Sequence, residues 1–286
     1  MAERTPAGPI DVHAHYLPSW RAPMPAELFD LGAQLAEMDR LGIALRVVCP
    51  PPFALAYVGE PDANLNRALA RAVSTAGSRF LGLGTVPLHR PEAAAAELRR
   101  CMAELGLRGV TIGSDAGEGR ELDAPDLEPF WAAAEDLGAL ILLHPSDVPG
   151  AARMGQYHLR NLVGNPMATA HAAARLIFGG VLDRHPGLRI VLSHGGGALP
   201  WIAGRLDHGY RVRPECGSAC AQPPSAYLRR FWYDTVVFEA GARRWLREQV
   251  GADRVVFGTD TPFDMGDAGG MDEADHGAAA ALLGMG

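Results

Sequence analysis

The chain has 286 residues, a length that suits one large domain better than two average ones. Apolar residues make up 48% and charged residues 21% of the chain, proportions that exclude a disordered protein. The formal net charge of −7 argues against nucleic acid or an anionic membrane as a partner, because both attract clustered Lys and Arg. We therefore expect a single domain over residues 1–286 that binds a small molecule.

The N-terminal residues lack the features of a targeting segment. Glu3, Arg4 and Pro6 interrupt any apolar run, and no later stretch approaches the roughly 18 apolar residues of a membrane span. The four cysteines are too few and too scattered for a disulfide framework. These features predict a cytoplasmic protein.

Short runs rich in Val, Ile and Leu alternate along the chain with Ala-rich segments of helical period. This alternation is typical of βαβ units around a parallel sheet. We expect strands at residues 10–16, 45–49, 80–87, 109–113, 140–144, 189–194, 233–238 and 254–260. Helix boundaries fit the same order, as where Pro91 begins a helix that ends before Gly106. Residues 278–283 leave room for less than two turns, so the eighth helix is either short or truncated.

Polar residues favour a closed (β/α)8 barrel over an open doubly wound sheet, which has the same local pattern. His144, His194 and Asp260 each stand at the C-terminal end of a predicted strand. In barrels this rim carries the catalytic groups. An open sheet would leave the first and eighth strands too far apart to share a site.

His13 and His15 lie on the first predicted strand. Side chains at i and i+2 point to the same face, about 7 Å apart along the strand, so both imidazoles enter the barrel. Together with His144, His194 and Asp260 they form a constellation that can bind a divalent cation. Zinc accepts imidazole and carboxylate ligands and is the expected ion, although manganese, iron and cobalt accept the same set.

The order of these motifs resembles the amidohydrolase superfamily, and within it the aminocarboxymuconate-semialdehyde decarboxylase-like branch. The resemblance covers residues 10–265. It rests on four motifs: His13-x-His15, His144-Pro145, the HGGG element at residues 194–197, and Gly258-Thr-Asp-x-Pro-Phe263.

The resemblance implies that His13, His15, His144 and Asp260 are the metal ligands, with water completing the shell. It also implies that His194 acts beside that water as general base or substrate polariser. The fourth predicted strand contains no Lys, so the bridging carbamate of binuclear relatives is absent and the site should hold one ion. Asp260 is expected to act both as a metal ligand and as a catalytic residue.

The expected substrate contacts are less uniform. The resemblance implies a homodimer in which Arg205 reaches the neighbouring site to bind a substrate carboxylate. A guanidinium group suits this role because it can donate two parallel hydrogen bonds to a carboxylate. Gln34 stands where the related decarboxylase has a second arginine, which indicates a different substrate, with one carboxylate rather than two. His158, Phe53 and Trp20 lie in loops at the predicted rim and are further candidates, although apolar packing is an alternative role for Phe53 and Trp20.

These observations lead to a metal-dependent, non-oxidative decarboxylase of a small unsaturated or aromatic carboxylic acid. Two alternatives remain open at this point. The same site could hydrolyse a lactone, ester or amide, or hydrate a double bond. A barrel that binds a ligand without turnover is the third possibility, and stoichiometric metal analysis separates it from the other two.

Overall fold

The computed structural model describes residues 7–18, 24–55, 64–117 and 119–285. The strands run parallel in two hydrogen-bonded groups, β1-β2-β3 and β4-β5-β6-β7. Their bounds are β1 Ile10–His15, β2 Leu45–Cys49, β3 Phe80–Gly82, β4 Gly109–Ile112, β5 Leu140–Leu143, β6 Arg189–Leu192 and β7 Trp232–Tyr233.

Single bridges join the two groups into a (β/α)8 barrel. Gly84 pairs with Val110 between the ends of β3 and β4. The extended segment at residues 255–261 takes the eighth position, where Val255 pairs with Tyr233 of β7 and Thr261 pairs with Ala14 of β1. The predicted barrel is therefore confirmed, and β1 lies beside the eighth segment as a shared site requires.

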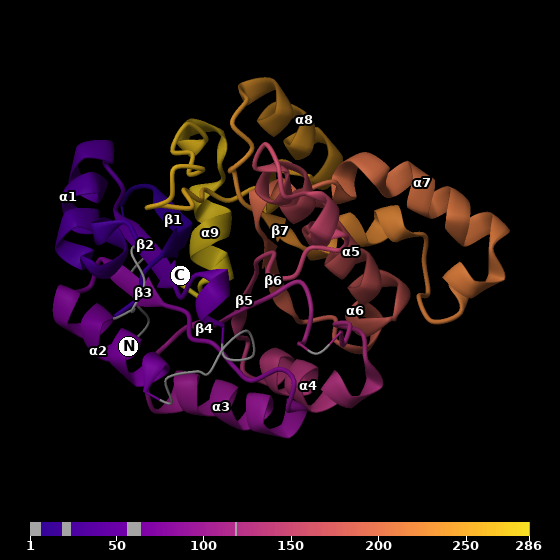
Figure 1. The fold of residues 1–286 in the computed structure, drawn as a ribbon, viewed down its shortest axis with the longest axis horizontal. Coiled ribbons are helices and arrows are strands. Elements are labelled where there is room, and N and C mark those ends of the chain that lie inside the picture. The colour runs from indigo at the N-terminus through magenta and orange to yellow at the C-terminus, as the bar shows by residue number, and fades with distance from the viewer. Residues whose placement is uncertain (1–6, 19–23, 56–63, 118, 286) are drawn as a thin grey trace.

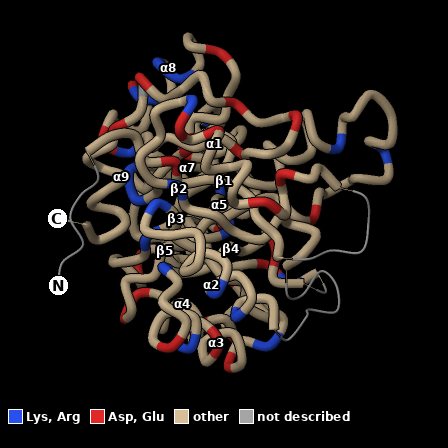
Figure 2. Tube along the Cα trace, turned by 90° about the vertical axis from the view of Figure 1, so that its left-hand side faces the viewer, with Lys and Arg blue, Asp and Glu red and all other residues tan. Residues whose placement is uncertain are grey.

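Helices surround these strands (Figure 1). Their bounds are α1 Leu31–Leu41, α2 Leu65–Ala76, α3 Pro91–Ala103, α4 Glu128–Asp136, α5 Asn165–Phe178, α6 Val181–Arg184, α7 Leu199–Val212, α8 Ala240–Val250 and α9 His276–Leu282. Figure 2 shows acidic and basic residues interspersed on the helices of one side. Within the described ranges, no helix combines the length and apolar composition that a bilayer crossing requires.

Two strands are much shorter than the sequence predicts, and the eighth, expected at residues 254–260, forms only isolated bridges at Val255 and Thr261. The third was expected at residues 80–87, but regular pairing ends at Gly82 and continues only through the bridge at Gly84. The seventh was expected at residues 233–238 and ends at Tyr233, because the chain turns there: the Val236 N–H donates to Asp234 Oδ1 and the Val237 N–H to the Thr235 carbonyl oxygen. Both differences lie where the strands give way to rim loops. The apolar composition of a segment does not encode the backbone geometry of such loops.

The last helix, α9, is short, as the sequence predicts. Its side chains Ala279, Ala280 and Leu282 are buried in the same apolar cluster as Leu140 and Val256, which belong to the barrel wall. Asp275 caps the helix by accepting a hydrogen bond from the Ala278 N–H. Seven residues thus suffice to cover this part of the core.

A buried ion pair joins β1 and β2. Arg46 of β2 donates from Nε to Asp11 Oδ2 at 2.8 Å, and both side chains are fully buried. Asp11 Oδ1 also accepts the N–H of Thr259 at 3.1 Å, so its carboxylate links β1 to the eighth segment. Burial raises the pKa of Asp11, and Arg46 opposes that rise.

Arg46→Met should destabilise the protein by about 3–5 kcal/mol, because it leaves the buried Asp11 carboxylate without its counter-ion. Denaturant unfolding of the metal-loaded protein measures the change. Arg213→Met is the matched control, since Arg213 pairs with Glu215 at an exposed surface and its loss should cost at most about 1 kcal/mol. Equal unfolding free energies for the two variants would contradict this account.

Candidate metal centre and active site

Four side chains from separate parts of the barrel rim converge on one point. His13 and His15 come from β1, His144 directly follows β5, and Asp260 lies in the eighth segment. Their ligand atoms all lie within 4.8 Å of one another. Asp260 Oδ1 is 3.3 Å from His13 Nε2 and 2.9 Å from His15 Nε2. This spacing leaves room for one cation among the four.

The outer nitrogens of the imidazoles are held so that the inner ones face the cluster. His13 Nδ1 lies 2.6 Å from Asp234 Oδ2, and His144 Nδ1 lies 3.1 Å from the carbonyl oxygen of Pro145. Both oxygens only accept hydrogen bonds, so each Nδ1 carries a proton and the Nε2 lone pair can bind a metal. Such outer partners are typical of metal-binding histidines.

Two buried atoms in the cluster are placed as cation ligands. Among the described residues, His144 Nε2 and Asp260 Oδ1 make no hydrogen bond of acceptable geometry, although Asp260 Oδ1 lies close to the three imidazoles. Burial lowers the pKa of His144 to about 3, which keeps its imidazole neutral. Burial opposes ionisation of Asp260, but His13, His144 and His15 hold its pKa well below the usual range. A neutral imidazole and an ionised carboxylate are the forms that bind a divalent ion.

The electrostatic field at His13 also favours a positive charge. Burial alone would lower the pKa of His13, yet the carboxylates of Asp260 and Asp234 raise it to about 10. His15 differs, because burial lowers its pKa and its Nδ1 contacts Cys49 Sγ at 3.5 Å. The four residues therefore fit one divalent metal ion, with two carboxylates to balance its charge.

His194 stands beside this cluster and is separate from it. Its Nε2 lies 3.2 Å from Asp260 Oδ2, the oxygen that faces away from His13 and His15. The ring centroid is 5.0 Å from that of His144. Its side chain is 15% exposed, so it reaches the cavity above the cluster. His194 can therefore exchange a proton with a bound molecule without leaving the ligand set incomplete.

The glycines after His194 form a tight left-handed turn. Gly195, Gly196 and Gly197 have φ values of 61°, 75° and 58°, a region that residues with a Cβ rarely adopt. A Cβ on Gly197 would lie 2.1 Å from the carbonyl oxygen of Pro166. The Gly195 N–H donates to Asp234 Oδ1 at 2.9 Å. These glycines thus permit close packing of the turn against the barrel and fix the position of His194.

Backbone strain is concentrated at the rim. The described non-glycine residues with positive φ are Tyr157, His158, His194, Phe238 and Asp260. All except Tyr157 line a cavity above the metal cluster. Such strained conformations persist where surrounding structure holds them, and they gather at functional sites.

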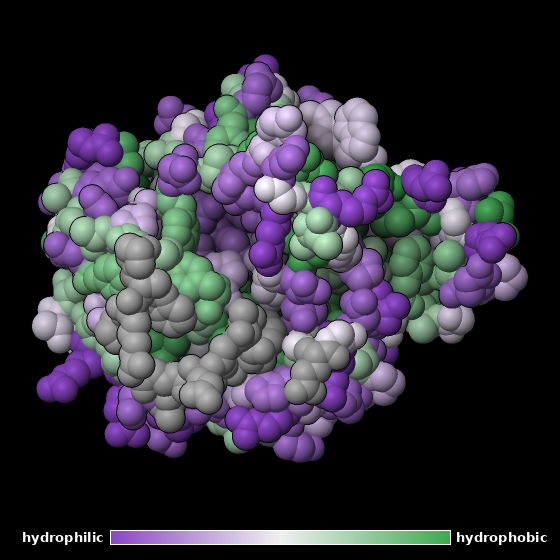
Figure 3. Space-filling model, viewed as in Figure 1, coloured by the Kyte–Doolittle hydropathy of each residue, from purple (hydrophilic) through white to green (hydrophobic). Residues whose placement is uncertain are grey.

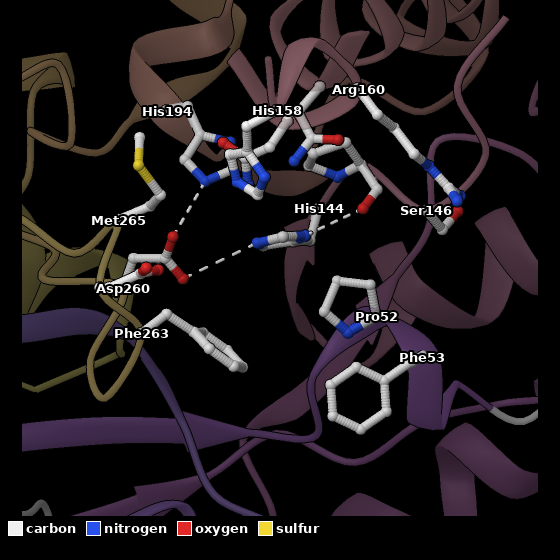
Figure 4. Close-up of a pocket in the computed structure, with 14 residues that line it drawn as sticks. Pro52, Phe53, His144, Ser146, His158, Arg160, His194, Asp260, Phe263 and Met265 are labelled. Carbon is white, nitrogen blue, oxygen red and sulfur yellow. Dashed lines mark hydrogen bonds and ion pairs between the residues drawn. The ribbon is translucent and has the colours of Figure 1, made fainter. Parts of the chain in front are cut away.

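A cavity of about 430 Å³ opens above the cluster, a size in the range of small-molecule sites. Figure 4 shows Phe53, Pro52 and Phe263 on one side and Arg160, His158 and His194 on the other, with His144 between the two sides and Asp260 at one end. Figure 3 shows a hollow on this face of the molecule, with hydrophilic residues inside it. The cavity therefore places an apolar wall opposite a cationic and hydrogen-bonding one.

Only some of the predicted substrate contacts line the cavity. His158 and Phe53 line the cavity. Gln34 does not, because it is buried and its amide donates to the carbonyl oxygen of His15 at 2.8 Å. Arg205 is exposed on α7 and does not line the cavity of its own chain. Trp20 lies outside the described residues.

Gln34 therefore supports the end of β1 and does not contact a ligand in this cavity. The sequence suggested a substrate contact, because the position aligns with an arginine of the relatives. The structure instead directs the amide to the main chain, and Arg46 Nη1 lies 3.5 Å from its Oε1.

Asp234 is a site residue that the sequence analysis missed. It directly follows β7, is fully buried, and connects His13 to the turn after His194. In the sequence it stands near the start of the predicted strand at residues 233–238, so its place at the end of the actual strand was hidden. Arg160 was also missed, since an arginine in a rim loop carries no distinguishing spacing.

Comparisons with known proteins agree with this geometry. The amidohydrolase family model matches residues 10–282. A 2-amino-3-carboxymuconate-6-semialdehyde decarboxylase from Dictyostelium discoideum is 37% identical over 246 residues, 84% of this chain and 68% of the relative. The solved 2,6-dihydroxybenzoate decarboxylase from Rhizobium is 26% identical with a TM-score of 0.82, over 96% of this chain and 98% of that one. A 5-carboxyvanillate decarboxylase from Novosphingobium aromaticivorans, solved with manganese and 4-hydroxy-3-methoxy-5-nitrobenzoic acid, is 25% identical with a TM-score of 0.81, over 97% and 93%.

Proposed function

Because the chain belongs to the amidohydrolase superfamily, in its aminocarboxymuconate-semialdehyde decarboxylase-like branch, we propose that it decarboxylates a small aromatic or unsaturated carboxylic acid in a metal-dependent, non-oxidative reaction. The observation that carries the proposal is the convergence of three imidazole Nε2 atoms and one carboxylate oxygen beside His194, at the floor of a cavity. The names of the relatives support the aromatic or unsaturated class.

His13, His15, His144 and Asp260 would hold one divalent ion. We favour zinc, since three imidazoles and one carboxylate suit it, with manganese as the alternative that one relative contains. The β4 strand contains Thr111 and no Lys, which supports a single ion. When bound, the ion supplies a Lewis acid that polarises a substrate oxygen.

His194 would move the proton that the reaction requires. Decarboxylation replaces the bond between carbon and the carboxyl group by a bond between carbon and hydrogen, and releases carbon dioxide. A proton therefore has to reach the carbon atom that loses the carboxyl group, and His194 is the cavity imidazole that lies beside the ligand group without belonging to it. Arg160 and His158, on the polar wall, would orient the anionic substrate.

Carbon dioxide release from a panel of hydroxybenzoates and muconates tests the proposal. The protein is stripped with a chelator and reloaded with zinc or manganese before each assay. We expect stoichiometric metal and gas release only from the reloaded protein. Alcohol or amine products without gas would indicate the hydrolase alternative. Bound substrate with neither product would indicate a barrel without turnover.

Replacing His194 by Gln should lower kcat by about 10²–10⁴, the range of general acid–base catalysis. Metal content should stay at the wild-type level, because the four ligand atoms lie in other residues. Steady-state kinetics and elemental analysis of the same sample measure both effects. Wild-type kcat in this variant would remove His194 from the mechanism.

Arg205 can act on a substrate only if a second copy of the chain brings it to a neighbouring cavity. It shares an exposed stretch of α7 with Trp201, which is 77% exposed. We therefore propose a homodimer in which Arg205 contacts the partner's substrate. Sedimentation should give a dimer, and Arg205→Ala should raise KM about tenfold or more with unchanged metal content. A monomer with full activity would contradict this.

A further inference from the structure

A second cavity of about 290 Å³ adjoins the first. Five residues line both of them: Asn161, Asn165, His194, Asp260 and Met265. We call the second cavity the outer lobe. Since His194 and Asp260 belong to both walls, the reacting centre lies at the junction, and a single ligand can occupy both cavities.

The outer lobe differs chemically from the first cavity. The residues that line only the outer lobe carry no charge: Leu162, Pro166, Gly197, Val236, Val237 and Phe238. The first cavity instead has Arg160, His158, Ser146 and Asp264 on its own walls. An apolar wall holds water weakly. A hydrocarbon group that displaces this water therefore binds more favourably, roughly in proportion to the apolar area that it buries.

The apolar wall is held in a strained shape. Phe238 has a φ of 63°, which is unfavourable for a bulky residue, and its N–H donates to Asp267 Oδ2 at 2.9 Å. Arg243 Nη1 lies 2.9 Å from the same oxygen, and both side chains of this pair are largely buried. An ion pair from two other elements thus fixes the loop after β7 at the cavity.

The opposite wall is also irregular. Leu162 belongs to a π-helical turn, Arg160–Gly164, that precedes α5. Single π-helical turns are rare and frequently occur at functional sites. Leu162 is 49% exposed and Phe238 55% exposed, so the lobe is apolar yet opens toward solvent at its outer end.

We propose that the outer lobe is a subsite for an apolar substituent of the substrate, so that the protein prefers ring acids bearing a hydrocarbon chain. The occupant follows from continuity with the reacting centre, because a ring beside His194 directs one of its substituents into the lobe. The open end admits a chain longer than the lobe itself. The inference deepens the proposed function and rests on it for the ring acid.

The probes are 2-nitrophenols that carry linear alkyl chains of increasing length at each ring position. Their nitro group stands in for the planar, negatively polarised carboxylate and cannot leave as carbon dioxide. Calorimetry on the metal-loaded protein gives Kd for each compound. For at least one ring position, Kd should fall about two- to fourfold per added carbon, as the burial of one methylene predicts, until the lobe is full.

Leu162→Trp fills the lobe, and Val163→Trp is the matched control. Both residues are partly exposed neighbours in the same turn, at 49% and 44%, but Val163 lines neither cavity. The readout is the ratio of Kd for the unsubstituted compound to Kd for the best alkylated one within each variant. We expect this ratio to fall to about threefold or less in Leu162→Trp, and to match the wild-type ratio in Val163→Trp.

Two results would overturn the subsite. One is a Kd independent of chain length at every ring position. The other is a chain-length dependence that survives in Leu162→Trp. Failure of the proposed function would give a different result. Binding of the nitrophenols would still depend on chain length, but no carboxylic acid would release carbon dioxide. The subsite would then stand, and the proposed reaction would be wrong.

Discussion

Asp260→Asn should lower decarboxylase activity by about a thousandfold or more and abolish stoichiometric metal binding. Asp260 is the only carboxylate in the ligand group, and its Oδ1 lies within 3.3 Å of both β1 imidazoles. An amide keeps the shape of the side chain and removes the charge that balances a divalent ion. Loss of a single transition-state donor already costs about 10²–10³ in rate, and loss of the ligand removes the electrophile altogether.

Elemental analysis and steady-state kinetics on the same preparation measure this prediction. Asp264→Asn is the control for metal content, because Asp264 lines the same cavity and is absent from the ligand group. Circular dichroism confirms that both variants are folded. An Asp260→Asn protein that retains one metal ion per chain would show that the ion is held elsewhere.

Asp234→Asn should weaken metal binding by about 10–100-fold, although Asp234 does not reach the metal position. Its Oδ2 accepts the proton of His13 Nδ1 at 2.6 Å, while Oδ1 accepts the Gly195 N–H. Because Gly195 fixes the carboxylate through Oδ1, an amide would present its NH2 group to His13. The proton of the imidazole would then move to Nε2, which could no longer bind the ion.

Titration with a competing chelator gives the affinity of Asp234→Asn for zinc. Asp183→Asn is the control, since Asp183 accepts a hydrogen bond from Tyr227 at an exposed site and should leave the affinity unchanged. A variant that binds metal as tightly as wild type but unfolds more readily would assign Asp234 a structural role alone. Excess zinc should restore part of the activity if the tautomer is the cause.

Some site residues carry a pattern in the sequence and others do not. His13 and His15 were identifiable as an i, i+2 pair of imidazoles on one strand, and His144 and Asp260 as metal-binding residue types at the ends of two others. Asp234 has the same placement, but it follows a two-residue strand whose end the apolar pattern does not mark.

Gln34 was placed incorrectly relative to the cavity for the opposite reason. Its alignment with an arginine of the relatives suggested a substrate contact, and only the fold shows that its amide donates to the His15 carbonyl. Arg160 carries no signal in the sequence, since a single arginine in a loop is ordinarily solvated. Loop geometry decides such cases, and loop geometry depends on contacts between distant segments.

The sequence by itself determined the barrel, the order of its elements and the four residues that converge at the rim. Apolar runs of strand length, and functional residues at their ends, are local features that can be recognised without tertiary information. The hydrogen bond between Asp234 and His13, the two cavities and the strained loop at Phe238 depend instead on tertiary contacts. These arise from pairs such as Asp234 with His13 and Asp267 with the Phe238 N–H, whose partners are far apart in the chain and meet only when the barrel closes.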